Sequence, residues 1–369
     1  MTRKSTRYLV KAGISVAFFW MLFSYVQGNE LAAMLDRIDW LYFILSFLLV
    51  PVMLSVSCLK WKMLLDVREP RIPFLTLIRI YLIGYFFSNL LPSNVGGDVV
   101  RSYYTGRLIN SQSYSAVCVF VERFSGVLLL ILLVIFAPLL RPHLYSSPYV
   151  IIPAMAALVL LFIIGWVWSV REPLKLPEKM MNMFFAGLRK VAEKSGGRVL
   201  PRALLSCENF GHALFRKLTR FHEDLIGAVN VIRKDGVLLA KLIVITVFFY
   251  FLTWVNVYVS FLAFGVHPDF LAVCALVPVI MFAAHLPVTL LGNLGYFESV
   301  FVFYFVLIGI PPAETLAMGL LLRLKMMCLG VFGYLVYLLY KYHRTQELAQ
   351  LEEFARQSRA RPEADNRMK

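Results

Sequence analysis

The sequence predicts an all-α polytopic membrane protein with about eight transmembrane helices, additional re-entrant or broken helices, and an inverted-topology repeat. Hydrophobic residues make up 60% of the 369 residues, and the mean hydropathy of +0.72 lies far above that of soluble proteins. Apolar runs of about 20 residues, the length that a helix needs to cross the hydrocarbon core, recur along the chain. In addition, two similar glycine-containing motifs lie in the two halves of the chain.

Several apolar windows are long enough to span a bilayer. They are residues 8–27, 40–59, 118–140, 149–170, 238–265 and 317–340. The first window lacks a small-residue cleavage site, so we expect it to remain as an anchor. Two further apolar stretches have a different role. We interpret 74–91 as re-entrant, and 271–311 as either two short spans or a re-entrant hairpin.

The distribution of Lys and Arg predicts the orientation of the chain. Basic residues gather before the first window, at 60–71, in 171–236 and at 341–344, and the positive-inside rule places such stretches in the cytoplasm. The loops that contain few Lys and Arg are 28–39, 141–148 and 266–270. We therefore expect a protein of the plasma or inner membrane with both termini cytoplasmic.

One transmembrane domain is expected over residues 1–341, with repeat halves at about 38–140 and 236–341. The segment 171–236 between them carries 13 Lys and Arg against 7 Asp and Glu. It is either a pair of basic amphipathic helices on the inner leaflet or a solvated linker. The charged segment 342–369 is expected to be a disordered cytoplasmic tail.

The two motifs suggest the repeat. Residues 90–98 and 290–298 each contain Leu-Leu, then Asn-apolar-Gly, then an acid. Asn94 precedes Arg123 by 29 positions and Asn293 precedes Arg323 by 30. The first half begins with an inward helix and the second with an outward helix, which is typical of transporters whose broken helices meet at a midplane site. We expect the two loops to lie close together at mid-depth; ordinary surface turns are the alternative.

Charged residues within apolar segments are costly and are usually functional. The cations are Arg79, Arg101, Arg123, Arg323 and Lys325, and the anions are Asp98, Glu122 and Glu298. This excess of two positive charges favours a phosphate-bearing ligand, because arginine binds phosphate well. Arg79 and Lys325 are expected to snorkel to an interface. The Glu122-Arg123 pair has two interpretations, a structural ion pair or part of the ligand site.

The candidate site is therefore a translocation site and not a catalytic one. Its predicted substrate-binding or translocation residues are Asn94, Gly96, Gly97, Asp98, Arg101, Glu122, Arg123, Asn293, Gly295, Glu298 and Arg323. The five cysteines and six histidines show no spacing typical of a metal site, so no metal or cofactor is expected. Nucleic acid is not an expected partner, because the basic residues flank apolar spans.

The motif Leu91–Asp98 with Val100-Arg101, the Glu122-Arg123 pair and the motif Gly292–Glu298 before Arg323 resemble the lysylphosphatidylglycerol synthase transmembrane family, also described as flippase-like. The resemblance covers about residues 8–341. The second motif departs from the family pattern Gly-Gly-Leu-Gly-x-x-Glu at Asn293, which leaves the role of Asn293 open. Two-part members of the family combine such a region with a soluble synthase domain, and this chain has no polar segment long enough for one.

The resemblance implies lipid translocation, with membrane lipids that carry anionic headgroups as partners. We predict a flippase for an anionic phospholipid or a polyprenyl-phosphate-type lipid, and not an enzyme. The alternatives are a membrane-embedded glycosyl or headgroup transferase and a non-catalytic partner of an envelope-lipid synthase. The sequence leaves the lipid, the direction of transport, the coupling ion and the oligomeric state open.

Overall fold

The computed structural model describes residues 36–68, 72–90, 96–169, 235–285 and 295–365, together with four isolated residues between 170 and 234. All regular structure in these ranges is helical, which confirms the predicted fold class. Five of the described helices are long and apolar enough to cross a membrane, and three more are apolar but shorter. The predicted first span, 8–27, and nearly all of 171–236 lie outside the described residues.

The two halves have the same order of helices. The first half consists of α3 (Trp40–Leu65), α4 (Phe74–Leu90), α5 (Gly96–Leu108) and α6 (Gln112–Phe136). The second half consists of α10 (Gly236–Leu262), α11 (Phe270–Ala284), α12 (Tyr296–Val306) and α13 (Pro312–Asp365). Between the halves lie the 3-10 helices η1 (Ala137–Leu140) and η2 (Pro142–Ser146) and the helix α7 (Pro148–Ser169).

Equivalent helices also begin in the same way. The Asp39 carboxylate accepts hydrogen bonds from the backbone N–H groups of the first turn of α3, and the Asp235 carboxylate does the same for α10. Such side chains satisfy donors that have no partner inside the helix. A single proline, Pro51, lies inside α3, and Ser55 Oγ donates to its carbonyl oxygen at 2.7 Å.

The middle helices of each half are too short to cross a bilayer. They contain 17, 13, 15 and 11 residues, which correspond to lengths between about 17 and 25 Å, against a hydrocarbon core of about 30 Å. The helices of the pairs α4–α5 and α11–α12 pack against each other, and such short lengths favour re-entrant hairpins over spanning helices. For 271–311, these lengths favour the re-entrant hairpin over two short spans.

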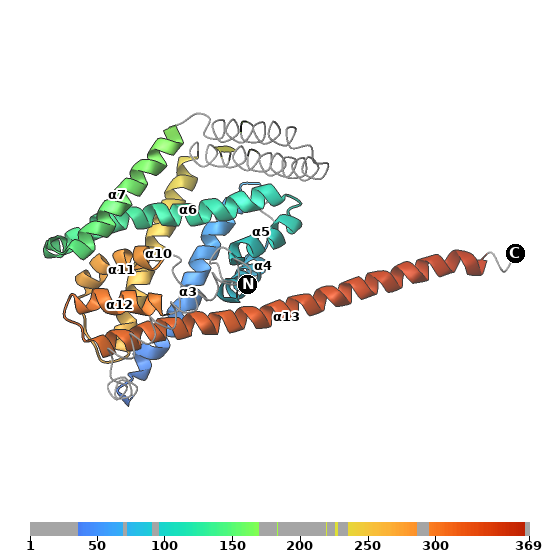
Figure 1. Cartoon of the computed structure of the whole chain (residues 1–369). Helices are drawn as coiled ribbons and strands as arrows, with labels where there is room; N and C mark the ends of the chain where they lie inside the picture. Colours follow the sequence, from blue (N-terminus) through green and yellow to red (C-terminus); the bar gives the residue numbers. More distant parts are fainter. Residues whose placement is uncertain are drawn as a thin grey trace, which may run out of the picture.

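The two halves interlock. In Figure 1, α6 and α13 lie on opposite sides of the bundle, with α3 and α10 crossing between them and the two hairpins at opposite ends. The helices α3 and α10 pack against each other, and each hairpin packs against the long final helix of the other half, α4 on α13 and α11 on α6. The same contact is thus made twice between the two halves, as a pseudo-two-fold relation between them requires.

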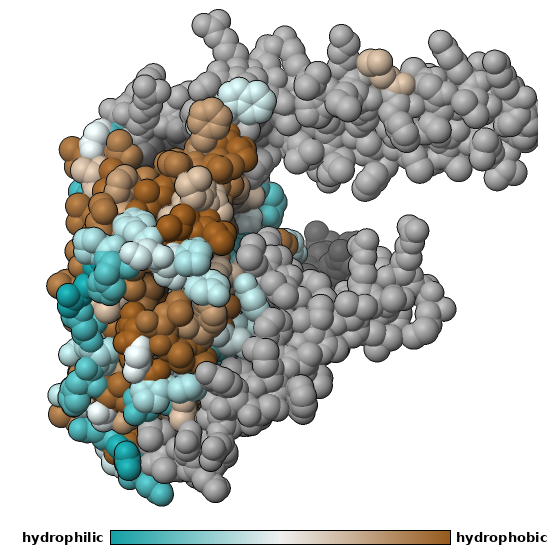
Figure 2. Space-filling view, turned by 60° about the vertical axis from the view of Figure 1, so that its left-hand side comes forward, coloured by the Kyte–Doolittle hydropathy of each residue, from teal (hydrophilic) through white to brown (hydrophobic). Residues whose placement is uncertain are grey.

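The surface of the described helices is mainly apolar. Figure 2 shows hydrophobic side chains covering much of one face of the molecule. Large side chains such as Phe162, Trp166 and Phe332 are 75%, 65% and 64% exposed. A water-soluble surface would not carry an apolar area of this extent. The helices therefore contact lipid, in agreement with the composition.

The loops that we predicted to face outward come together on one side of the bundle. The backbone N–H of Asp39 donates to the carbonyl oxygen of Ala263 at 2.9 Å. The Arg141 guanidinium forms an ion pair with the carboxylate of Asp269, the N-cap of α11. Contacts among three loops so far apart in the sequence agree with the predicted topology. Which side is the cytoplasm stays a prediction.

The end of the chain differs from our expectation. Instead of a disordered tail over 342–369, α13 continues as one helix to Asp365. The segment 345–360 is rich in Ala, Leu, Glu, Gln and Arg. These residues have high intrinsic helix propensity, so the helix does not end where its apolar part ends.

Candidate functional site

A first charge cluster, formed by Asp98, Arg101, Glu122 and Arg123, lies where α5 meets α6. Asp98 is in the first turn of α5, and its Oδ1 accepts from Arg101 Nη2 at 2.7 Å and from Arg123 Nε at 3.1 Å. Arg101 Nη2 also donates to Glu122 Oε2 at 2.9 Å. Arg101 is 1% exposed and Glu122 is 6% exposed, whereas the Arg123 side chain is 51% exposed. The Arg123 side chain is thus the cation of this cluster that a ligand can reach.

Aromatic rings fix the position of Arg101. Its guanidinium carbon lies 4.2 Å from the ring centre of Tyr81 and 5.1 Å from that of Trp61. A cation over an aromatic face is attracted by the ring quadrupole, most strongly where water is absent. Arg101 is therefore enclosed by two rings and two carboxylates, and its main effect is to hold Asp98 and Glu122 in place.

A second charge cluster, formed by Glu298, Arg323 and Lys325, lies where α12 meets α13. Glu298 is 1% exposed; its Oε1 accepts from Arg323 Nε at 2.7 Å and its Oε2 accepts from the backbone N–H of Gly295 at 2.8 Å. Gly295 has a φ of 82°, a backbone conformation that glycine adopts without steric cost. Glu298 therefore joins the start of α12 to Arg323, about three turns into α13.

The acid–arginine pairs of the two clusters occupy equivalent positions. Asp98 and Glu298 each lie in the first turn of the returning hairpin helix, and each precedes its arginine by 25 residues. Arg123 and Arg323 each follow the first residue of a 29-residue span by 11 positions. The same ion pair is thus built twice, on helices of opposite predicted direction.

Two buried lysines differ from the sequence interpretation. Lys325 does not snorkel: it is 3% exposed, and its Nζ donates to Asn256 Oδ1 at 2.7 Å and to Ser260 Oγ at 2.8 Å. The reason is that α13 turns this face toward α10. Lys60, which we assigned to a cytoplasmic basic stretch, is 6% exposed and lies beside Gly126 of α6. Arg79 is exposed, as a snorkelling residue would be.

The sequence contained no signal that separates Lys60 from Lys62. Both lysines lie near the end of the same helix, on either side of Trp61. Among the helix neighbours of Lys60 at three- and four-residue spacing, Leu64 is 3% exposed, whereas Ser57 is only partly buried. The burial of Lys60 therefore becomes visible only in the structure.

Two glycines of the predicted translocation site have a packing role. Gly96 and Gly97 do not form a loop; they are the first residues of α5 and are buried. A Cβ atom on Gly97 would lie 2.2 Å from the carbonyl oxygen of Gly84 in α4. Gly97 therefore allows the backbones of α4 and α5 to touch. Asn94 and Asn293 lie outside the described residues, as do both loops that we expected to meet at mid-depth.

Two hydrogen bonds nevertheless connect the surroundings of the two clusters. Asn89, next to the last residue of α4, donates through Nδ2 to the Met326 carbonyl oxygen at 3.1 Å, one turn beyond Arg323 on α13. From the second half to the first, the Tyr250 hydroxyl of α10 donates to the carbonyl oxygen of Gly126 in α6 at 2.9 Å. Tyr250 precedes Asn256 by six residues, or about 9 Å along the helix. Both clusters therefore border the same stretch of α10.

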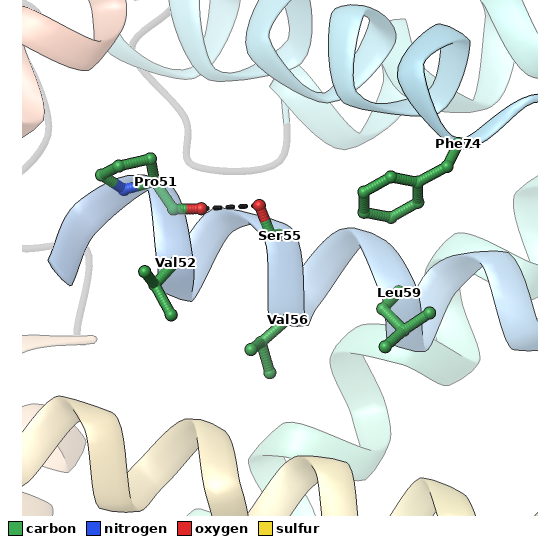
Figure 3. A pocket seen from close by; sticks show the side chains of 6 residues that line it. All are labelled: Pro51, Val52, Ser55, Val56, Leu59 and Phe74. Atoms are coloured by element: carbon green, nitrogen blue, oxygen red, sulfur yellow. Dashed lines mark hydrogen bonds between the residues drawn. The ribbon is translucent and has the colours of Figure 1, made fainter. Parts of the chain in front are cut away.

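An apolar groove of about 370 Å³ lies on α3, away from these charges. Its lining residues are Pro51, Val52, Ser55, Val56, Leu59 and Phe74. Figure 3 shows Phe74 facing α3 from the start of α4, beside Ser55 and Leu59. The groove contains no charged residue, so it does not provide a headgroup site.

The described cysteines are free thiols and lie mostly inside the bundle. Cys58, Cys118, Cys274 and Cys328 are free thiols, and the first three are buried. Cys207 lies outside the described residues. In the part of the chain that the structure describes, no three His, Cys, Asp or Glu side chains gather as a metal site would require.

Comparisons with known proteins extend these observations. A family model described as the lysylphosphatidylglycerol synthase transmembrane region matches residues 8–346. A UPF0104 membrane protein of Methanocaldococcus jannaschii is 26% identical over 109 residues, and one of Archaeoglobus fulgidus is 28% identical over 88 residues. These matches cover 29% and 24% of this chain and only 32% and 27% of the two relatives. No solved structure matches the chain significantly.

Proposed function

The chain belongs to the lysylphosphatidylglycerol synthase transmembrane family, and from this we propose that it is a lipid translocator of the cell membrane. Its substrate would be an anionic phospholipid or a polyprenyl-phosphate-type lipid. The headgroup would pass between the two charge clusters while the acyl or prenyl chains remain in the bilayer. Both termini would be cytoplasmic. The membrane-lipid role follows from the family, and the translocation is our inference.

The observation that carries the proposal is the repeated acid–arginine pair. A single buried ion pair is common as a structural contact, and it adds little to stability once desolvation is included. Short broken helices at equivalent positions of inverted halves are instead typical of secondary transporters, and in this chain each such helix begins with one acid of the repeated pairs. The two pairs are Asp98 with Arg123 and Glu298 with Arg323.

The charges of the two clusters also fit a phosphate. Lys60, together with the two clusters, gives five cations against three carboxylates, the same excess of two that the sequence predicted with Arg79 in place of Lys60. An excess of positive charge in a low-dielectric environment attracts an anion strongly. Because the Arg123 side chain is half exposed, it can exchange part of its contact with Asp98 for a phosphate oxygen.

Lipid scrambling in vesicles tests this proposal. The purified full-length chain is placed in liposomes with fluorescent lipids of different headgroups, and the reagent-accessible fraction is followed in time. We expect faster exchange for anionic lipids than in protein-free liposomes. The matched control is Arg79→Gln, which removes an exposed arginine outside both clusters and should leave exchange unchanged.

The alternatives predict other results. A transferase would convert the lipid headgroup when given an activated donor, and a non-catalytic partner would alter neither the lipid nor its distribution. If folded, reconstituted protein exchanges no anionic lipid faster than empty liposomes, the translocator proposal is wrong.

A further inference from the structure

The positive charge of the site resides in its lysines and not in its arginines. Each arginine of the two clusters bonds a carboxylate, so the three arginines and three carboxylates neutralise each other. Among the residues that the structure describes, no ion pair includes Lys60 or Lys325, although both are buried. The breaks at 91–95 and 286–294 contain no acidic residue that could balance them.

The two lysines lie at equivalent places of the repeat, where the first and the last helix of each half meet. The acids of the repeated pairs, and likewise their arginines, are 200 positions apart in the numbering. At the same offset, Lys60 of α3 corresponds to Ser260 of α10, and Ser125 of α6 corresponds to Lys325 of α13. Ser260 Oγ accepts from Lys325 Nζ at 2.8 Å. A Cβ on Gly126, the neighbour of Ser125, would lie 3.9 Å from Lys60 Nζ.

A buried lysine therefore fills the contact between the first and last helix of each half, supplied by the first helix in one half and by the last helix in the other. Packing alone does not require this result, since an apolar residue would fill the same space without the cost of a charge at membrane depth. Lys325 has three N–H donors, and Asn256 and Ser260 accept two of them. One donor is left for a ligand.

We propose that Lys60 and Lys325 form two anion-binding stations, one in each half, each suited to a singly charged phosphodiester headgroup. The proposal rests on the translocator function and specifies its substrate class. Each cluster, counted together with its buried lysine, carries one net positive charge, because the first then has three cations and two carboxylates and the second has two cations and one carboxylate. A phosphodiester neutralises one station, whereas a diphosphate would leave an unbalanced negative charge.

The two stations belong to different helices of the bundle. Lys60 is five residues from the end of α3, and Lys325 follows the start of α13 by 13 residues. A headgroup that passes through the protein could therefore contact the two lysines in succession.

The test measures lipid preference directly, without transport. Full-length protein in vesicles of phosphatidylcholine is probed with spin-labelled phosphatidylglycerol and spin-labelled phosphatidylcholine. We expect wild-type protein to prefer phosphatidylglycerol, and Lys60→Gln or Lys325→Gln to reduce this preference at least about tenfold, since each loses a charged hydrogen bond. The control Lys62→Gln makes the same charge change at a partly exposed lysine that is paired with Asp66, and it should change the preference less than about twofold.

Because the two positions are equivalent in the repeat, a second kind of variant can be made, in which the lysine and the serine of the opposite helix exchange places. In Lys60→Ser/Ser125→Lys and Lys325→Ser/Ser260→Lys, the charge moves to the opposite helix across the same contact. Both should retain the preference for phosphatidylglycerol if the charge and not the particular side chain forms the station. If a glutamine variant yields no folded protein, the corresponding exchanged variant decides, and a folded exchanged variant without the preference would overturn the proposal.

The result separates this proposal from the proposed function. Preference for phosphatidylglycerol that persists when both lysines are replaced, in monodisperse protein, would overturn the stations. Lipid exchange that persists in that double variant would also overturn them while supporting translocation. A lysine-dependent preference in a protein that exchanges no lipid would support the stations and refute the translocator.

Discussion

Replacing Arg323 by Gln should destabilise the protein far more than replacing Arg123 by Gln, although the two arginines are equivalent in the repeat. Glu298 is 1% exposed, and its carboxylate accepts from Arg323 and from the backbone N–H of Gly295. Without Arg323 the carboxylate remains buried without its counter-ion. Asp98, in contrast, keeps its 2.7 Å contact with Arg101 when Arg123 is replaced.

The exposures of the two pairs set the expected magnitudes. Removing one partner of a buried ion pair typically costs about 3–5 kcal/mol, which applies to Arg323, whose side chain is 11% exposed. The Arg123 side chain is 51% exposed, and pairs with such a partner contribute about 0.2–1 kcal/mol. The free energies of unfolding of the two variants should therefore differ by at least about 2 kcal/mol.

Unfolding in mixed micelles, with tryptophan fluorescence as the signal, measures this difference. Arg323→Gln/Glu298→Gln provides the control, because the amide oxygen introduced by Glu298→Gln can still accept from Gly295 while no buried carboxylate is left without its counter-ion. We expect this double variant to recover most of the stability lost in Arg323→Gln. Equal losses for Arg123→Gln and Arg323→Gln, or no recovery in the double variant, would refute the assignment of the cost to an unpaired buried carboxylate.

Gly97→Ala should strongly reduce the yield of monodisperse protein in size-exclusion chromatography, because its Cβ would lie 2.2 Å from a backbone oxygen of α4, whereas Gly165→Ala, with no atom within 4 Å of its Cβ, should be tolerated. Arg123→Lys should fold normally but lower lipid exchange several-fold, because lysine lacks the planar fork that contacts Asp98 through both Nε and Nη2; normal exchange would show that charge alone suffices. Single cysteines in 171–236 should resist an impermeant thiol reagent added outside the cell, and strong labelling there would contradict the predicted topology.

The sequence by itself determined the class of protein, most of the spans and the existence of the repeat. The reason is that the bilayer constrains local sequence directly: a spanning helix needs about 20 apolar residues, whatever its neighbours are. The spacing from the motif acids to Arg123 and Arg323 was equally visible, because an internal repeat preserves intervals along the chain. In the structure these acids form ion pairs with these arginines.

The tertiary structure alone decided which charges are balanced. Lys60 and Lys62 are two residues apart on the same helix, yet one is buried beside Gly126 and the other pairs with Asp66 near the helix end. The direction in which a side chain points depends on which helix packs against it, and that partner lies far away in the sequence. For the same reason Lys325, expected at the interface, meets Asn256 inside the bundle, since the packing of α10 against α13 sets that contact.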